Sequence, residues 1–239
     1  MSTVHVIVPA GIDDPVRPSG GNTYDRRILD GLSATGWDVR EYAVNGTWPV
    51  PDNSSEETLG QLVAGIPDGA LVLVDGLIAS TAPDVLVPEA KRLRLVVLVH
   101  LPLGAAPSGH VAADARSREH AVLSAAVAIV TTSGWTRQQL LDLYALRPDA
   151  IHVAEPGVEP AELAAGSPAG GELLCVATVA PHKGQDVLLA ALARIADLPW
   201  RCVFVGSLDR DPAYVRRLRA SAAADGSADR VGFAGALTG

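Results

Sequence analysis

The stretch ELLCVATVAPHKGQDVLLAALARIADLPWRCVFVG, residues 172–206, decides the fold. It opens and closes with apolar, β-branched runs at 172–179 and 201–206, which are typical of buried strands. The segment between them carries apolar residues at helical spacing, namely Val187, Leu188, Ala191 and Leu192. A strand, a helix and a second strand in this order predict a βαβ unit with its two strands parallel in one sheet.

The same alternation continues through the 239 residues of the chain. Further strand-like runs lie at 4–9, 39–44, 70–75, 94–100, 128–133, 151–156 and 230–235. Helical patterns separate most of them, such as the stripe of Tyr24, Ile28, Leu29 and Leu32. The sequence therefore predicts an α/β fold of doubly wound parallel sheets.

The segment PAELAAGSPAGG, residues 160–171, interrupts this alternation with Gly, Pro, Ser and Ala. It has no apolar periodicity, which is typical of a linker. We predict an N-terminal Rossmann-like domain at 1–160, a linker at 161–171 and a second domain at 172–239. The second domain offers three strands and two helices, so we expect the first half of a Rossmann-like domain, with exposed apolar faces that favour self-association.

Composition argues against several classes of partner. The formal net charge of −8 disfavours nucleic acid, since binding of its phosphate backbone requires clustered cations. The short basic clusters at 91–94 and 216–219 are interpreted as solvated surface, and contact with an anionic membrane is the less favoured interpretation. No apolar run approaches the roughly 18 residues of a membrane helix, and no secretory signal opens the chain, so we expect a cytoplasmic protein.

Several catalytic motifs do not occur in the sequence. The loop after the first strand lacks G-x-G-x-x-G, and the chain lacks the P-loop and the G-x-S-x-G nucleophile elbow. No zinc motif is present, and Cys175 and Cys202 lie in strand-like runs as small core residues. Acidic residues such as Asp75 are open to interpretation as loop or helix-capping residues.

Glycines after the first strand predict one candidate ligand site. Gly20 and Gly21 directly precede Asn22, which we expect to be the N-cap of a helix that starts near Thr23. Adjacent glycines let a backbone approach a ligand closely. On spacing alone, a flexible surface loop explains the two glycines equally well.

The stretch that decides the fold carries a second candidate. Its first strand ends in a loop with His182, Lys183 and Gly184, and the helix from about Gln185 points its N-terminus at the same space. The lysine ammonium and backbone N–H groups freed by the glycine would suit a diphosphate. An exposed lysine in an ordinary strand-to-helix loop is the alternative, and spacing alone does not decide between them.

Taken in order, these segments are similar to a known family. The sequence resembles the retaining glycosyltransferases of family 4, which have a GT-B architecture of two facing Rossmann-like domains. The resemblance covers nearly the whole chain. It rests on GGNTYDRRILDGLSATGWDV, LVVLVH, AIVTTSGWTRQQL, IHVAEPGVE, ELLCVATVAPHKGQDVLLAALARI, WRCVFVG and DRVGFAGAL.

The resemblance implies roles for individual residues. Gly20 and Gly21, followed by Asn22, match the glycine loop that faces the donor diphosphate. His100 matches a histidine near the donor sugar, although a hydrogen-bonded histidine at a strand end is the simpler interpretation without the family. Lys183, followed by Gly184, matches the lysine that binds the diphosphate.

One position departs from the common family pattern. Thr178 stands where many members carry a phosphate-binding arginine, although members with threonine there also exist. The chain therefore lacks the positive charge of that arginine at this position. His182 is a candidate to replace part of that charge, to an extent that depends on pH, because the ordinary pKa of histidine is about 6.5.

The resemblance implies the reaction as well. A sugar would move from a nucleotide-diphosphate donor to an unknown acceptor hydroxyl with retention of anomeric configuration, without a metal or other cofactor. The family's Glu-x7-Glu segment, which holds the donor sugar and ribose, does not occur within the 239 residues, so we expect a truncated donor domain. The alternatives are a non-catalytic module that binds a nucleotide or a partner, and a sugar-nucleotide epimerase of similar architecture.

Overall fold

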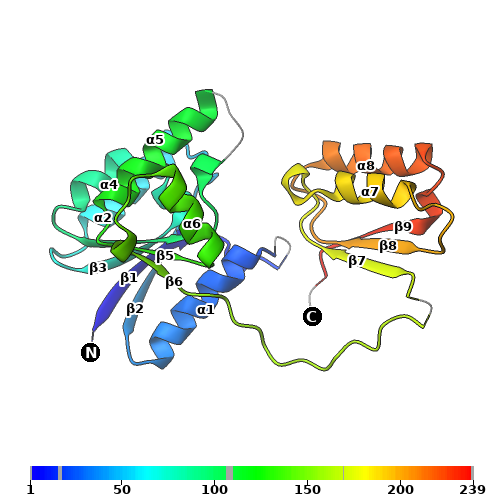
Figure 1. Ribbon diagram of the computed structural model, residues 1–239. Coiled ribbons are helices and arrows are strands. Elements are labelled where there is room, and N and C mark those ends of the chain that lie inside the picture. Colours follow the sequence, from blue (N-terminus) through cyan, green and yellow to red (C-terminus); the bar gives the residue numbers. More distant parts are fainter. Residues whose placement is uncertain (1, 16–17, 106–109, 169, 238–239) are drawn as a thin grey trace. The chain divides into compact units, whose positions relative to one another are not determined.

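A computed structural model describes residues 2–15, 18–105, 110–168 and 170–237 (Figure 1). The chain divides into two compact units, one of Met1–Ile12 and Gly21–Val158 and the other of Asp13–Gly20 and Glu159–Gly239. Each unit is built around one parallel sheet. In the described ranges, no helix has the length and apolar character needed to cross a membrane.

The first unit contains six parallel strands in the order β2-β1-β3-β4-β5-β6. Their bounds are β1 Thr3–Pro9, β2 Asp38–Val44, β3 Leu71–Asp75, β4 Arg94–Val99, β5 Ala128–Thr131 and β6 Ile151–Val153. The chain moves outward from β1 to β2 and then returns to β3 on the other side of β1. In open parallel sheets, the carboxyl edge beside such a reversal is the usual place for a ligand.

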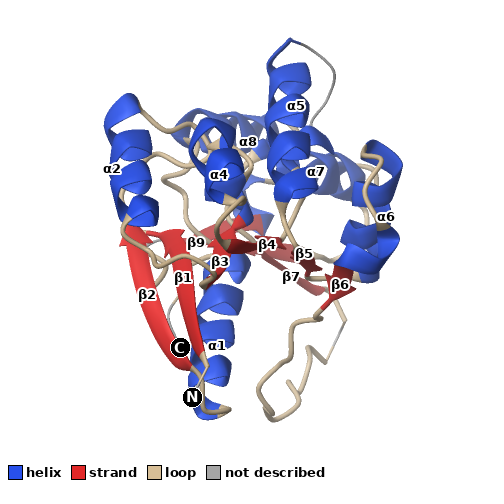
Figure 2. Ribbon diagram, turned by 90° about the vertical axis from the view of Figure 1, so that its left-hand side faces the viewer, coloured by secondary structure: helices blue, strands red, loops and turns tan. Residues whose placement is uncertain are grey.

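Helices cover both faces of this sheet (Figures 1 and 2). Their bounds are α1 Gly20–Ala34, α2 Asn53–Ala64, α3 Gly76–Ala79, α4 Pro83–Glu89, α5 His110–Ala125 and α6 Gly134–Leu143. Because successive strand residues point to opposite faces, Val4, Val6 and Val8 of β1 pack with Leu29 of α1. Ile7 instead belongs to the larger core on the opposite face. This core includes Leu59 of α2, Leu86 of α4, Val122 of α5 and Leu140 of α6.

The second unit contains three parallel strands in the order β7-β8-β9. These are β7 Glu172–Val176, β8 Arg201–Val205 and β9 Val231–Gly235, with the helices α7 Gln185–Ala193 and α8 Pro212–Ala224. Buried side chains of β8, including Phe204, pack with residues of α7 and α8. In β7, Leu174 and Val176 remain 68% and 71% exposed, so this strand is poorly covered.

All nine strands expected from the sequence are present. The expected stripe of the helix after β7 is confirmed for Leu192, which is buried, and for Leu188, which packs against the core. It is wrong for Val187, which is 70% exposed, and for Ala191, which is also exposed. The buried residues of α7 are Gln185, Leu189 and Leu192. In a segment as uniformly apolar as VLLAAL, periodicity fits more than one stripe, and tertiary packing selects the face.

The start of α1 also differs from expectation. The helix begins at Gly20, so Asn22 lies within its first turn and is not its N-cap. Neither glycine adopts a positive φ, so both continue the helix instead of forming a loop before it. Downstream, residues 154–168 and 170–171 form no regular helix or strand. The domain limits 1–160 and 172–239 stay a prediction, and residues 169, 238 and 239 lie outside the described residues.

Candidate functional site

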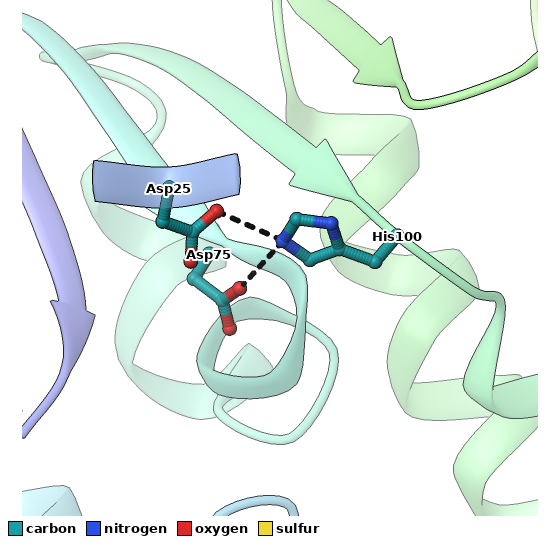
Figure 3. A group of neighbouring side chains, drawn as sticks. All are labelled: Asp25, Asp75 and His100. Carbon is teal, nitrogen blue, oxygen red and sulfur yellow. Dashed lines mark hydrogen bonds and ion pairs between the residues drawn. The ribbon is translucent and has the colours of Figure 1, made fainter. Parts of the chain in front are cut away.

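Three polar side chains converge at the carboxyl edge of the first sheet (Figure 3). Asp75 is the last residue of β3, His100 directly follows β4, and Asp25 comes from α1. The Nε2 atom of His100 lies 2.8 Å from Oδ1 of Asp25 and 3.4 Å from Oδ2 of Asp75. We call these three residues the His–Asp cluster.

Strand register explains why Asp75 and His100 meet. β3 and β4 are parallel neighbours, with Asp75 paired to Leu98, so both strands end at the same edge. Asp75 also caps α3, because its Oδ1 accepts the Leu77 N–H at 2.8 Å. A Cβ on Gly76 would lie 2.8 Å from the Leu98 carbonyl oxygen. Only glycine therefore lets this turn pass so close to β4.

Hydroxyl groups from the next strand–helix connection fix the backbone of His100. The side chains of Thr132 and Thr136 each donate to the His100 carbonyl oxygen at 3.3 Å. Ser133 between them caps α6, since its Oγ accepts the Thr136 N–H at 3.0 Å. The position of the His100 ring is thus supported by backbone that is itself hydrogen-bonded.

The helix α1 places Asp25 in the cluster by burying one polar turn. Tyr24 and Asp25 are both buried, and the Tyr24 hydroxyl donates to the Ala154 carbonyl oxygen at 2.7 Å. The Tyr24 ring meets the His100 ring edge-on, with 5.4 Å between centroids. This packing brings the Asp25 carboxylate to the Nε2 edge of the imidazole.

Burial and mutual interaction shift both titrating groups. Burial raises the pKa of Asp25 to about 6, with the hydrogen bond from His100 opposing this rise and the Asp75 charge adding to it. Burial by itself lowers the pKa of His100, but its hydrogen bonds to Asp25 and Asp75 outweigh that effect and raise the pKa to about 9. At neutral pH the cluster therefore holds an imidazolium between two carboxylates.

The His–Asp cluster is the only group of at least three metal-ligand side chains found together in the described part of the chain. Its ligand atoms lie within 4.8 Å of one another. The 2.8 Å distance from Nε2 to Asp25, however, is that of a charge-assisted hydrogen bond with the proton between the two atoms. The geometry therefore fits a shared proton.

A buried glutamate anchors the loop that follows His100. Glu119 of α5 is 0% exposed and accepts hydrogen bonds from the backbone N–H groups of Leu103 and Gly104 at 3.0 and 2.8 Å. It also accepts from the hydroxyls of Ser80 at 2.9 Å and Tyr144 at 2.6 Å. Sequence reasoning missed this residue, because one glutamate among the charged residues of a helix gives no sign of burial.

In the second unit, Lys183 lies in a short 3₁₀ turn, Pro181–Lys183, between β7 and α7. Its side chain is exposed and forms no ion pair with any described residue. Gly184 has φ of 69°, a left-handed conformation that favours glycine. Its N–H donates to the Pro181 carbonyl oxygen at 3.1 Å, so the N–H of the glycine itself is not available to a ligand.

Thr178 contributes its backbone to this loop. The Gln185 side chain is only 1% exposed, and its Nε2 donates to the Thr178 carbonyl oxygen at 3.0 Å. This bond ties the segment after β7 to the first turn of α7. In the same turn, the Asp186 N–H donates to the Tyr214 hydroxyl at 3.0 Å, so it is not available to a ligand.

His182 does not supply the expected charge at neutral pH. Partial burial lowers its pKa, and the nearby charges of Lys183 and Arg210 lower it further. The imidazole is therefore neutral at pH 7. Arg210, an exposed residue in the loop after β8, is a cation near this loop that sequence reasoning did not select.

The predicted site residues thus fall into two groups. Gly20, Gly21 and Asn22 form the first turn of α1, the helix that also carries Asp25 of the His–Asp cluster. The residues of the second unit follow β7 in one loop, namely Thr178, His182, Lys183 and Gly184. The first group lies at the start of a helix, and the second lies at the carboxyl end of β7.

Comparison with known proteins gives one curated relative. No protein-family model matches the chain. The D-inositol 3-phosphate glycosyltransferase of Acidothermus cellulolyticus is 36% identical over 134 residues, which are 47% of this chain and 29% of that protein. The match therefore spans less than a third of the relative's length.

Solved structures match the chain over almost its whole length. A glycosyltransferase from Rickettsia africae matches 99% of this chain and 69% of its own, with a TM-score of 0.59 and 15% identity. HepE of Anabaena, solved with UDP-glucose, matches 100% and 70%, with a TM-score of 0.67 and 15% identity. The predicted GT-B-type α/β fold is confirmed. The lipopolysaccharide outer core galactosyltransferase WaaB matches 100% and 69%, with a TM-score of 0.63 and 12% identity.

Proposed function

We propose that this chain is part of a glycosyltransferase that moves a sugar from a nucleotide-diphosphate donor to an acceptor hydroxyl, with retention of anomeric configuration. The observation that carries the proposal is the match of 99–100% of the chain to a solved glycosyltransferase and a solved galactosyltransferase. The 36% identity to an inositol phosphate glycosyltransferase over nearly half the chain supports it independently. Retention rests on the sequence resemblance to family 4.

The second unit supplies the proposed contact with the donor diphosphate. Lys183 is an exposed cation in the loop after β7 and forms no ion pair with a described acid. Arg210 adds a second cation near that loop. In this proposal, both cations stabilise the negative charge that develops on the diphosphate as the glycosidic bond breaks, a purely electrostatic contribution to catalysis.

The carboxyl edge of the first sheet and the start of α1 supply the proposed contacts with the sugar. His100 is an imidazolium held by buried carboxylates at the carboxyl edge of the sheet. The protonated imidazole there would donate a hydrogen bond to a sugar oxygen, and its positive charge would offset negative charge of the nucleotide sugar. Gly20 and Gly21 at the start of α1 have no side chain, and open space surrounds the position of a Cβ on Gly20. No metal or other cofactor has a role in this scheme.

The test is a transfer assay with the 239-residue chain and UDP- and GDP-sugars. Inositol phosphate is the first acceptor to try, because the curated relative is named for it. Mass spectrometry would detect the glycoside, and the anomeric proton coupling in its NMR spectrum would report the configuration. We expect a product with the donor's configuration. Nucleotide binding without transfer would instead support a non-catalytic module, and an inverted product would rule out retention.

A further inference from the structure

The two acids of the His–Asp cluster do not hold the imidazole equally. The Nε2 atom of His100 has one hydrogen to donate, and Asp25 Oδ1 at 2.8 Å is closer than Asp75 Oδ2 at 3.4 Å. Only the shorter distance is that of a strong charge-assisted hydrogen bond. The other carboxylate oxygen of Asp75, Oδ1, accepts a hydrogen bond from the Leu77 N–H. Asp25 is therefore the principal acceptor for the imidazole.

The surroundings of the ring contain no competing cation among the described residues. From α1 come the Asp25 carboxylate and the edge of the Tyr24 ring, and from the end of β3 comes Asp75. The hydroxyls of Thr132 and Thr136 contact the His100 carbonyl and carry no charge. The His100 ring is thus the only described cation that pairs with either acid.

This arrangement determines what the other ring nitrogen offers to a ligand. No hydrogen bond joins Nδ1 of His100 to a described residue, and Figure 3 shows both carboxylates on the Nε2 side of the ring. When the ring is doubly protonated, Nδ1 carries a hydrogen and donates; when it is neutral with the hydrogen on Nε2, Nδ1 accepts. Two buried carboxylates favour the doubly protonated ring.

We propose that Asp25 is a positioning residue that keeps His100 doubly protonated, so that Nδ1 presents a cationic N–H donor to an oxygen of the sugar donor. This inference rests on the proposed function for the identity of the ligand. Its first part concerns the protein alone. Replacement of Asp25 by Asn keeps the shape of the side chain and removes its charge, so it lowers the pH at which Nδ1 changes from a donor to an acceptor.

The test is an NMR titration of the His100 ring in the full chain without substrate, with its signals assigned by H100Q. We expect an imidazole pKa of about 9 in the unmodified protein and a value at least one unit lower in D25N. D30N removes the same charge from an exposed position of α1 and is the matched control, with no expected change. D75N should lower the His100 pKa less than D25N does, because Asp75 Oδ2 lies farther from Nε2 than Asp25 Oδ1 does.

Three results would overturn the inference. One is a His100 pKa in D25N that differs by less than about 0.3 from the value in the unmodified protein, a difference too small for a titration to resolve. Another is a larger decrease in D75N than in D25N. The third is a change in the His100 signals on addition of EDTA, which would show a metal in the cluster in place of the proton.

Kinetics with a nucleotide sugar extend the test to the ligand. If Nδ1 donates in the complex, D25N should move the basic limb of the pH profile of kcat/KM down by the same amount as the His100 pKa, while D30N leaves it in place. An unmoved limb would overturn the donor role of Nδ1. If the unmodified chain transfers no sugar at all, the proposed function fails, and the substrate-free titration still decides the role of Asp25.

Discussion

Replacement of Glu119 by Gln should destabilise the first unit strongly, although the two side chains have nearly the same shape. Glu119 is 0% exposed and accepts four hydrogen bonds, from the Leu103 and Gly104 N–H groups and the Ser80 and Tyr144 hydroxyls. Gln places an NH2 group where one carboxylate oxygen stands. The hydroxyls can rotate to accept from this group, but a backbone N–H cannot.

The magnitude follows from the contacts. Each carboxylate oxygen accepts from one hydroxyl and one backbone N–H, so either orientation of the Gln amide leaves one buried N–H unpaired. That costs about 1–3 kcal/mol, and the remaining bonds weaken because their acceptor is no longer charged. We expect the free energy of unfolding to fall by about 2–4 kcal/mol.

Urea denaturation followed by tryptophan fluorescence and circular dichroism measures this loss. E57Q is the matched control, because Glu57 is exposed in α2, and it should change the free energy of unfolding by less than about 0.5 kcal/mol. A loss below that same limit in E119Q would refute the reasoning. It would mean that the Leu103 and Gly104 N–H groups find other partners, and that Glu119 does not anchor the loop after His100.

Three further predictions concern pH and the second unit. The folded-state pKa of His100 is raised to about 9, so protonation of His100 contributes stability that is fully present below about pH 6.5. On the order of 2–3 kcal/mol of this stability is lost as the pH rises through 9, and a loss of equal size in H100Q would contradict this. G206A should prevent stable folding of the second unit, because the backbone of Gly206 has a φ of 150° and an added Cβ would lie 2.0 Å from the Ala177 carbonyl oxygen. An unchanged Tm in a circular dichroism melt would show that Gly206 and Ala177 do not approach so closely. R210A should weaken UDP binding about tenfold by calorimetry, because it removes a cation near the Lys183 loop. R147A removes an exposed arginine of the first unit and should leave UDP binding unchanged. Equal affinities in the two variants would exclude Arg210 from the site.

Local sequence predicted the strands well for a physical reason. Runs such as LVVLVH combine β-branched residues with abrupt polar ends, and a parallel sheet covered on both faces needs this composition. The register of α7 was not predictable in the same way. Val187 and Leu189 are both apolar, and only the packing against Phe204 and its neighbours buries Leu189 and leaves Val187 exposed.

The His–Asp cluster shows where sequence reasoning stops. Asp75 ends β3 and His100 directly follows β4, so their meeting at one edge of the sheet follows from the parallel pairing of these two strands. Asp25 gives no such signal, because it lies in the first half of a helix among charged residues. Its burial depends on how α1 crosses the sheet, which is a tertiary property. The pKa of His182 is lowered first by partial burial and then by the charges of Lys183 and Arg210, and neither the burial nor the approach of Arg210 from a different loop can be seen in the local sequence.

The central claim is that the loop after β7 binds the diphosphate of a nucleotide sugar, and the two lysines of the chain allow a direct test. Lys183 lies in that loop, and Lys91 is exposed in the first unit. The decisive measurement is calorimetric titration of the unmodified chain, K183A and K91A with UDP-glucose and GDP-mannose. The proposal predicts stoichiometric binding of at least one of these, weakened about tenfold or more in K183A and unchanged in K91A. No binding to either nucleotide sugar, or equal affinity in the two variants, would contradict it.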